Sequence, residues 1–147
     1  MGHSLGGWAI MTVLATDLNK KLPSNLSTSS VQAMTGVKGA ILLYPYCPGL
    51  DSGGNNNWNN SIKTLVLMGG KDRLTKACLR TISTLNKKNK PVIFHVYPSA
   101  YHSYDESPED FKKISEWFKD AKPPDIEATA DSRERIKHFL SDVFSQP

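Results

Sequence analysis

The chain has 147 residues, 39% of them apolar and 22% charged, which is the composition of one soluble globular domain. Its net charge of +4 is spread along the sequence, and no apolar run approaches the ~18 residues of a membrane-spanning helix. The sequence therefore excludes a transmembrane protein and disfavours a dedicated nucleic-acid binder, and its two cysteines exclude a four-thiolate zinc site.

The first predicted element is a helix. Apolar residues recur at three- and four-residue spacing from Trp8 to Leu18, and Pro23 with a Ser/Thr/Asn cluster ends the pattern. Met1 stands directly before Gly2, which leaves no room for a preceding strand or a secretory leader. We therefore expect that an N-terminal part of the natural domain is missing, so the lack of a leader is weak evidence about location.

Three continuous apolar runs predict three strands that are covered on both faces, as in a parallel sheet. They are Gly39–Tyr44, Thr64–Met68 and Val92–Tyr97. Because doubly wound sheets usually have five or more strands, we interpret the chain as a single α/β domain over residues 1–147 that forms the second half of a larger fold.

Three further helices are expected between and after these strands. One starts near Thr75 and buries Cys78, Ile82 and Leu85. A second begins with Ser107 as its cap and Pro108 in its first turn. The last follows a capping box from Asp131 to Glu134, and its apolar face consists of Ile136, Phe139, Leu140, Val143 and Phe144.

The segment from Gly2 to Gly6 matches the G-x-S-x-G nucleophile elbow, in which a sharp strand-to-helix turn lifts the serine above the sheet. The glycines are expected because side chains at those positions would clash in the turn. The helix that follows would direct its N-terminal amides at the site. By composition alone the pattern occurs in about one chain in twenty of this length, so it is suggestive by itself.

The other members of a Ser, Asp, His triad are found in the order that this fold requires. Asp72 lies just beyond the strand Thr64–Met68, and His102 lies just beyond Val92–Tyr97. Asp51 and Asp105 are alternative acids, and we favour Asp72 over both. Three suitable residues at three expected strand ends are a more specific signal than the elbow alone.

Three segments carry a resemblance to the dienelactone hydrolase family. They are Gly-His-Ser-Leu-Gly-Gly at the start, Leu-Met-Gly-Gly-Lys-Asp with Cys78 six residues later, and Val-Tyr-Pro-Ser-Ala-Tyr-His-Ser-Tyr-Asp. The resemblance covers nearly the whole chain but only the C-terminal half of the family's fold. It implies a partial α/β-hydrolase fold with the last three parallel strands of eight, Ser4 as nucleophile, His102 as general base and Asp72 as the acid that orients it.

Two departures from the family pattern concern the substrate. Dienelactone hydrolases proper have cysteine as nucleophile where this chain has Ser4, and the lactone-cleaving members have an arginine where this chain has Glu106. The resemblance therefore implies hydrolysis of another ester, thioester or amide.

The backbone N–H of Leu5 would be one oxyanion donor, and the second comes from an early loop of the fold that this chain lacks.

Other residues near the predicted site have less specific interpretations. Tyr46, Trp58, Arg73 and Tyr101 could line a substrate pocket or simply cover the core. A catalytic role for His3 is disfavoured because its side chain would point away from the serine, and His95 and His138 are interpreted as structural or solvated. No metal site is expected, since no histidine pair has ligand spacing with a third ligand nearby.

Cys47 and Cys78 both lie just past strand ends on the same face, which raises the hypothesis of a disulfide. The alternative is two small buried thiols. A disulfide would imply an oxidising compartment, periplasmic or secreted, whereas free thiols fit a cytoplasmic protein.

The sequence thus predicts a serine hydrolase acting on a small-molecule ester or related acyl bond, without cofactor, nucleic acid or membrane. A second hypothesis is a non-catalytic C-terminal fragment, or one that needs a separate N-terminal half of the same fold as its partner. An acyltransferase or a peptidase on this fold stays open, because fold and triad do not define the acceptor.

Overall fold

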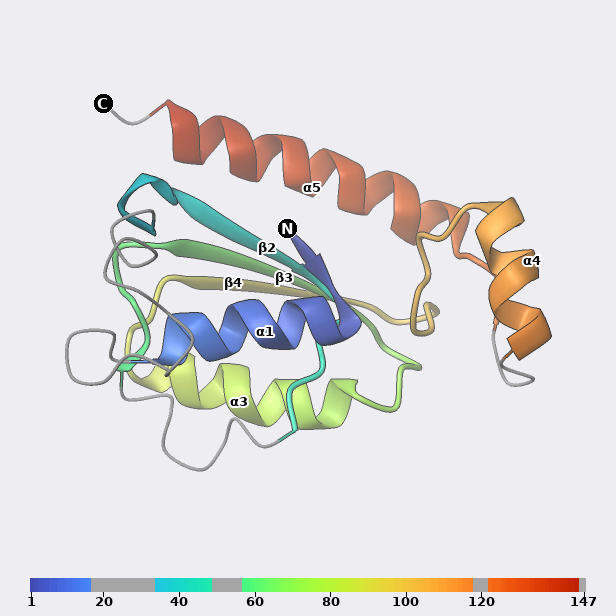
Figure 1. The fold of residues 1–147 in the computed structure, drawn as a ribbon, viewed down its shortest axis with the longest axis horizontal. Coiled ribbons are helices and arrows are strands. Elements are labelled where there is room, and N and C mark those ends of the chain that lie inside the picture. The colour runs from blue at the N-terminus through green and yellow to red at the C-terminus, as the bar shows by residue number, and fades with distance from the viewer. Residues whose placement is uncertain (17–33, 49–56, 118–121, 146–147) are drawn as a thin grey trace.

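The structure of this chain is a computed structural model that describes residues 1–16, 34–48, 57–117 and 122–145. Its centre is a four-stranded parallel sheet of order β1-β2-β3-β4 (Figure 1). The strands are β1 (Gly2–His3), β2 (Gly39–Leu43), β3 (Lys63–Gly69) and β4 (Val92–Tyr97). The predicted α/β class with a parallel sheet is confirmed.

Continuous apolar sequence explains the inner strands. All residues of β3 after Lys63 are buried, as are four of the five residues of β2. A strand can hold apolar side chains on both faces only where both faces are covered, which is the situation in parallel α/β sheets.

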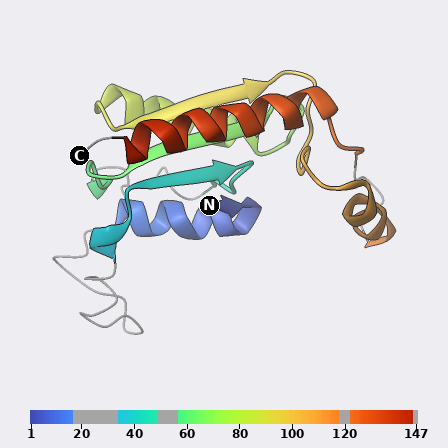
Figure 2. The same ribbon diagram turned by 90° about the horizontal axis from the view of Figure 1, so that it is seen from above.

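Helices supply that cover in two layers. Helices α1 (Ser4–Ala15) and α3 (Thr75–Lys87) lie on one face of the sheet, and α5 (Ile126–Phe144) crosses the other (Figures 1 and 2). The predicted burial of Cys78, Ile82 and Leu85 on α3 is confirmed.

Two short elements complete the described structure. The one-turn helix η1 (Met34–Gly36) precedes β2, and α4 (Pro108–Trp117) lies beyond the carboxyl ends of the strands (Figure 1). The Ser107 hydroxyl accepts a hydrogen bond from the N–H of Asp110 (3.1 Å), so the predicted cap of α4 is confirmed.

The expected number of strands was one too low. The structure has a fourth strand, β1, whose Gly2 and His3 lie opposite Leu42 and Leu43 of β2. Two residues are too few to produce a periodic or continuous apolar pattern, so the elbow motif, which follows a strand, is what points to β1.

The predicted start of the last helix was wrong. Helix α5 begins at Ile126, and its cap is Asp125, whose carboxylate accepts from the N–H of Ala128 at 3.0 Å. Asp131 lies inside the helix and pairs with Arg135 one turn later. Of the predicted apolar face, Phe139 and Val143 are buried while Phe144 is 70% exposed.

Helix α1 differs from the expected one-sided helix. Met11, Leu14 and Ala15 are buried, but Trp8 is 40% exposed and Leu5 is 65% exposed. The predicted stripe residue Leu18 and the Pro23 break lie outside the described residues. Helix α1 has no charged side chain, and its exposed face combines the apolar Leu5 and Trp8 with the polar Thr12.

Among the described helices, none is both long and apolar enough to cross a membrane.

Candidate active site

The carboxyl ends of the parallel strands bring three polar side chains together. Ser4 follows β1 directly as the first residue of α1. Asp72 lies in the turn after β3, and His102 lies in the turn after β4. Because the strands are parallel and adjacent, residues that are 98 positions apart meet at one edge of the sheet.

Ser4 has a backbone φ of 47°, in the left-handed region that residues with a Cβ rarely adopt. Such a conformation costs about 1–3 kcal/mol and persists where the surroundings impose it. Here the carbonyl of Ser4 accepts the N–H of Tyr46 at 3.0 Å, which ties the turn to the segment after β2. This turn from β1 into α1 has the backbone geometry predicted for a nucleophile elbow.

Two positions in this turn require glycine, Gly2 and Gly7. The sequence predicted Gly2 and Gly6 instead. A Cβ on Gly2 would lie 2.7 Å from the backbone of Gly6, and a Cβ on Gly7 would lie 2.7 Å from Cβ of Pro45. Nothing lies within 4 Å of a Cβ on Gly6, so the expected clash at that position is absent.

The three side chains form a hydrogen-bonded series. His102 Nε2 lies 3.0 Å from Ser4 Oγ, and His102 Nδ1 lies 2.7 Å from Asp72 Oδ2. The other carboxylate oxygen of Asp72 accepts the N–H of Leu74 at 2.9 Å. The Asp72 side chain is fully buried, whereas that of His102 is 36% exposed.

Backbone contacts hold the Asp72 and His102 turns together. The N–H of Gly70 donates to the carbonyl of Tyr97 (2.7 Å), and the N–H of Lys71 donates to the carbonyl of Ala100 (2.9 Å). A Cβ on Gly69 would lie 2.5 Å from the carbonyl oxygens of Ala100 and Tyr101. The turns can therefore approach this closely only because residue 69 has no side chain.

We expect Gly69→Ala to separate these turns, because the opposing atoms are backbone and cannot rotate away. The substitution should lower the free energy of unfolding by about 1–3 kcal/mol, as overpacking usually does. Urea denaturation measures the loss, with Gly36→Ala as a control in open space. A Gly69→Ala variant as stable as the parent would contradict the described packing.

Tyr44 is a site residue that the sequence reasoning missed. It is 2% exposed, and its ring meets the ring of His102 edge-on (centroids 4.8 Å apart) and stacks on His3 (5.7 Å). Its hydroxyl donates to Asp105 Oδ1 at 2.8 Å, which links the end of β2 to the His102 turn. The signal that could have identified Tyr44 is its position at the carboxyl end of β2, beside the predicted site.

The predicted pocket residues divide into two groups. Tyr46, Arg73 and Tyr101 lie at the same end of the sheet as Ser4, with the Tyr101 ring below the Lys71 ammonium (5.4 Å). Trp58 is buried. It lies at the opposite end of the sheet, because the N–H of its neighbour Asn59 donates to the carbonyl of Leu14 near the end of α1. Trp58 therefore does not line a pocket around Ser4.

The other acidic and histidine residues considered as site candidates in the sequence lie elsewhere or have other contacts. Asp105 binds the Tyr44 hydroxyl, and Asp51 lies outside the described residues. His95 lies on β4 next to Asp131, and His138 is exposed on α5. In the described part of the chain, no three His, Cys, Asp or Glu side chains are arranged to hold a metal ion.

Cys47 and Cys78 form a disulfide, with their Cα atoms 5.0 Å apart. The bond joins the segment after β2, which contacts Ser4, to α3, which follows the Asp72 turn. It therefore connects two of the segments that surround the site.

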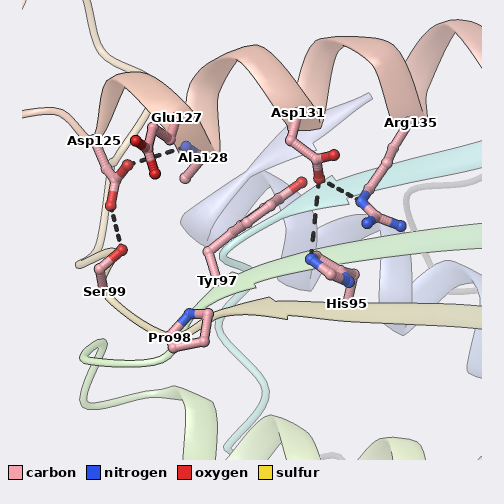
Figure 3. A pocket seen from close by; sticks show the side chains of 9 residues that line it. All are labelled: His95, Tyr97, Pro98, Ser99, Asp125, Glu127, Ala128, Asp131 and Arg135. Atoms are coloured by element: carbon pink, nitrogen blue, oxygen red, sulfur yellow. Dashed lines mark hydrogen bonds and ion pairs between the residues drawn. The ribbon is translucent and has the colours of Figure 1, made fainter.

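A polar hollow of about 290 Å³ lies elsewhere, between β4 and α5 (Figure 3). In it Asp131 contacts both His95 and Arg135, while the Asp125 carboxylate accepts from Ser99 (2.7 Å) and from the helix backbone. Burial lowers the pKa of His95, as does the nearby Arg135 guanidinium. These contacts attach α5 to the sheet edge.

The parallel sheet with helices on both faces is consistent with a partial α/β-hydrolase fold. The sequence profile of the Dienelactone hydrolase family matches residues 25–144, so the chain belongs to that family. The match includes Asp72 and His102, while Ser4 lies before it. No curated protein and no solved structure matches the chain.

Proposed function

We propose that this chain is a serine hydrolase that cleaves a carboxylic ester or a related acyl bond. Family membership supports a hydrolase. The observation that carries the finer proposal is the series of contacts from Ser4 Oγ through His102 (3.0 Å) to Asp72 (2.7 Å).

Each residue has a role in the proposed reaction. Serine is a weak nucleophile at its own pKa, so His102 Nε2 takes its proton as Oγ attacks the acyl carbon. The Asp72 carboxylate accepts Nδ1–H, which keeps the basic nitrogen toward Ser4 and stabilises the imidazolium. His102 then protonates the leaving group, and water activated by His102 hydrolyses the acyl-enzyme.

The N–H of Leu5, directly after the nucleophile, is the proposed oxyanion donor within the described residues. This fold takes a second donor from a loop that precedes the nucleophile in the chain. Loss of one donor costs about 10²–10³ in rate where it has been tested.

Hydrolysis of a substrate panel tests the proposal. Short-chain p-nitrophenyl esters should be hydrolysed and peptide p-nitroanilides should not, and Ser4→Ala should abolish turnover. Added alcohols should form little transfer product, which separates a hydrolase from an acyltransferase. Ester hydrolysis that survives Ser4→Ala would contradict the proposed mechanism.

A second candidate is a half-domain that becomes catalytic only with an N-terminal partner of the same fold. The observation that favours it is the outer face of α1, where Leu5 and Trp8 are exposed on a helix without charged residues. A helix without charged residues that exposes large apolar side chains is usually covered by another segment or chain. Activity that appears only after the N-terminal half is added would identify this case.

The proposed compartment is an oxidising one, periplasmic or secreted. The Cys47–Cys78 disulfide supports it, since such bonds are rare where glutathione keeps thiols reduced. Mass spectrometry of the unreduced native protein should find no alkylatable thiol. Two alkylated cysteines would instead favour the cytoplasm.

A further inference from the structure

Tyr44 has a backbone conformation that residues with a side chain rarely adopt. Its φ is 38°, in the left-handed region. Among the other described non-glycine residues with a positive φ, Ser4 and Ser103 lie at the same edge of the sheet, while Asn89 precedes β4. Such a conformation persists where the surrounding contacts impose it, and it is a reason to look for a function at that position.

Contacts with two neighbouring segments hold Tyr44 in this conformation. Its N–H donates to the carbonyl of Leu67 on β3 at 2.7 Å. Its ring is buried and meets the ring of Tyr104 edge-on, with the centroids 5.6 Å apart. Because a buried ring that is packed in this way has little room to turn, Tyr44 is a rigid support for the groups that it contacts.

The side chain of Tyr44 reaches the turn after β4 at two points. Its ring lies 4.8 Å from the ring of His102, measured between centroids, and its hydroxyl donates to Asp105 Oδ1 at 2.8 Å. Burial raises the pKa of Tyr44, as does the Asp105 carboxylate, so the hydroxyl keeps its proton and stays a donor. Since Asp105 follows His102 closely in the sequence, the hydrogen bond holds the same turn that the ring contacts.

The opposite side of this turn is attached to α5. The carbonyl of Tyr104 accepts hydrogen bonds from the N–H of Asp125 and from the Thr129 hydroxyl, both at 2.9 Å. The His102 side chain itself is 36% exposed, so packing does not enclose it. Its position relative to Ser4 therefore depends on the contacts that hold its turn, and Tyr44 supplies such contacts from the β2 side.

We propose that Tyr44 is a positioning residue of the Ser4 site: its ring and its hydrogen bond to Asp105 hold His102 where Nε2 can take the Ser4 proton. The inference rests on the proposed function, since it concerns the general base of that reaction. A displacement of about 1 Å can cost about 10²-fold in rate. The loss of one hydrogen bond, with the ring retained, should displace His102 less and cost about tenfold.

Tyr44→Phe tests the hydroxyl, because it keeps the ring. For hydrolysis of p-nitrophenyl butyrate, kcat should fall about tenfold while KM stays the same, since a displaced base slows acylation and deacylation alike. Tyr104→Phe is the matched control. It makes the same change on the buried ring next to Tyr44, and both constants should equal those of the parent chain.

Substitutions of Asp105 test the hydrogen bond from its other end. Asp105→Asn keeps an oxygen that can accept the Tyr44 hydroxyl, so kcat should stay near the parent value. Asp105→Ala removes the acceptor and should lower kcat by about the same factor as Tyr44→Phe. The double variant Tyr44→Phe, Asp105→Ala should be no slower than either single variant, because all three lack the same bond. Circular dichroism establishes that each variant is folded, and the two Asp105 variants carry the test if Tyr44→Phe does not fold.

The outcomes separate the two proposals. Equal kcat values for Tyr44→Phe and the parent chain would overturn the role of Tyr44 and leave the serine hydrolase intact. An equal loss in Tyr104→Phe, or losses that multiply in the double variant, would also overturn it, because either result would indicate a general effect on the fold. A folded parent chain that hydrolyses no ester would overturn the proposed function, and this inference with it.

Discussion

Asp72→Asn should lower the rate constant of ester hydrolysis by about 10⁴. With its oxygen on the N–H of Leu74, the new amide turns its NH2 group toward Nδ1 and donates to it. This favours the tautomer with the proton on Nε2, so Ser4 loses its base. The fold should survive, because the oxygen of the new amide can still accept the N–H of Leu74, which lies 2.9 Å from the Asp72 carboxylate. Circular dichroism and stopped-flow hydrolysis together measure both effects.

Asp105→Asn is the matched control, since it makes the same change in a second carboxylate near His102. The Asp105 side chain binds Tyr44 and not the imidazole, so its loss should cost far less than that of Asp72. A large loss of activity in Asp105→Asn together with a small loss in Asp72→Asn would contradict the assignment of Asp72 as the acid of the triad.

Removal of the disulfide should have the largest effect on stability. The bond joins residues 31 positions apart. In the chain-entropy model a closed loop of this length stabilises the fold by about 4 kcal/mol. The double variant Cys47→Ala, Cys78→Ala should therefore unfold at a temperature lower by on the order of 10 °C.

A dithiol reductant provides the control for that experiment. It should lower the unfolding temperature of the parent chain to nearly that of the double variant and leave the variant unchanged. A reductant that affects neither protein would mean that the two cysteines are not bonded in solution.

The sheet was predictable where the sequence is strongly patterned. Strands β2 and β3 are continuous apolar runs that need a sheet covered on both faces. The same cover was expected for β4, but β4 is the edge strand of the described sheet and its Ile93 is 52% exposed. Their carboxyl ends share one edge, so the positions of Asp72 and His102 followed from the strand assignments. The structure places Asp72 and His102 near Ser4. Their catalytic roles belong to the proposed function.

Other features depend on contacts that no local pattern encodes. Strand β1 exists because Gly2 and His3 pair with β2. Asp125 and Asp131 are both suitable helix caps by residue type, and the contact of Asp125 with Ser99 distinguishes them. The hydrogen bond from the N–H of Asn59 to the carbonyl of Leu14 shows at which end of the sheet Trp58 lies. Tyr44 contributes through its ring and hydroxyl contacts with residues some sixty positions away.

Labelling with a fluorophosphonate probe tests the proposed triad most directly, because it needs no knowledge of the substrate. Peptide mass spectrometry should find the adduct on Ser4 of the parent chain and none in Ser4→Ala. His102→Ala, which keeps the nucleophile but removes its base, should label only marginally. Folded parent protein without an adduct, or an adduct that forms equally fast in His102→Ala, would contradict a serine hydrolase assembled within these 147 residues.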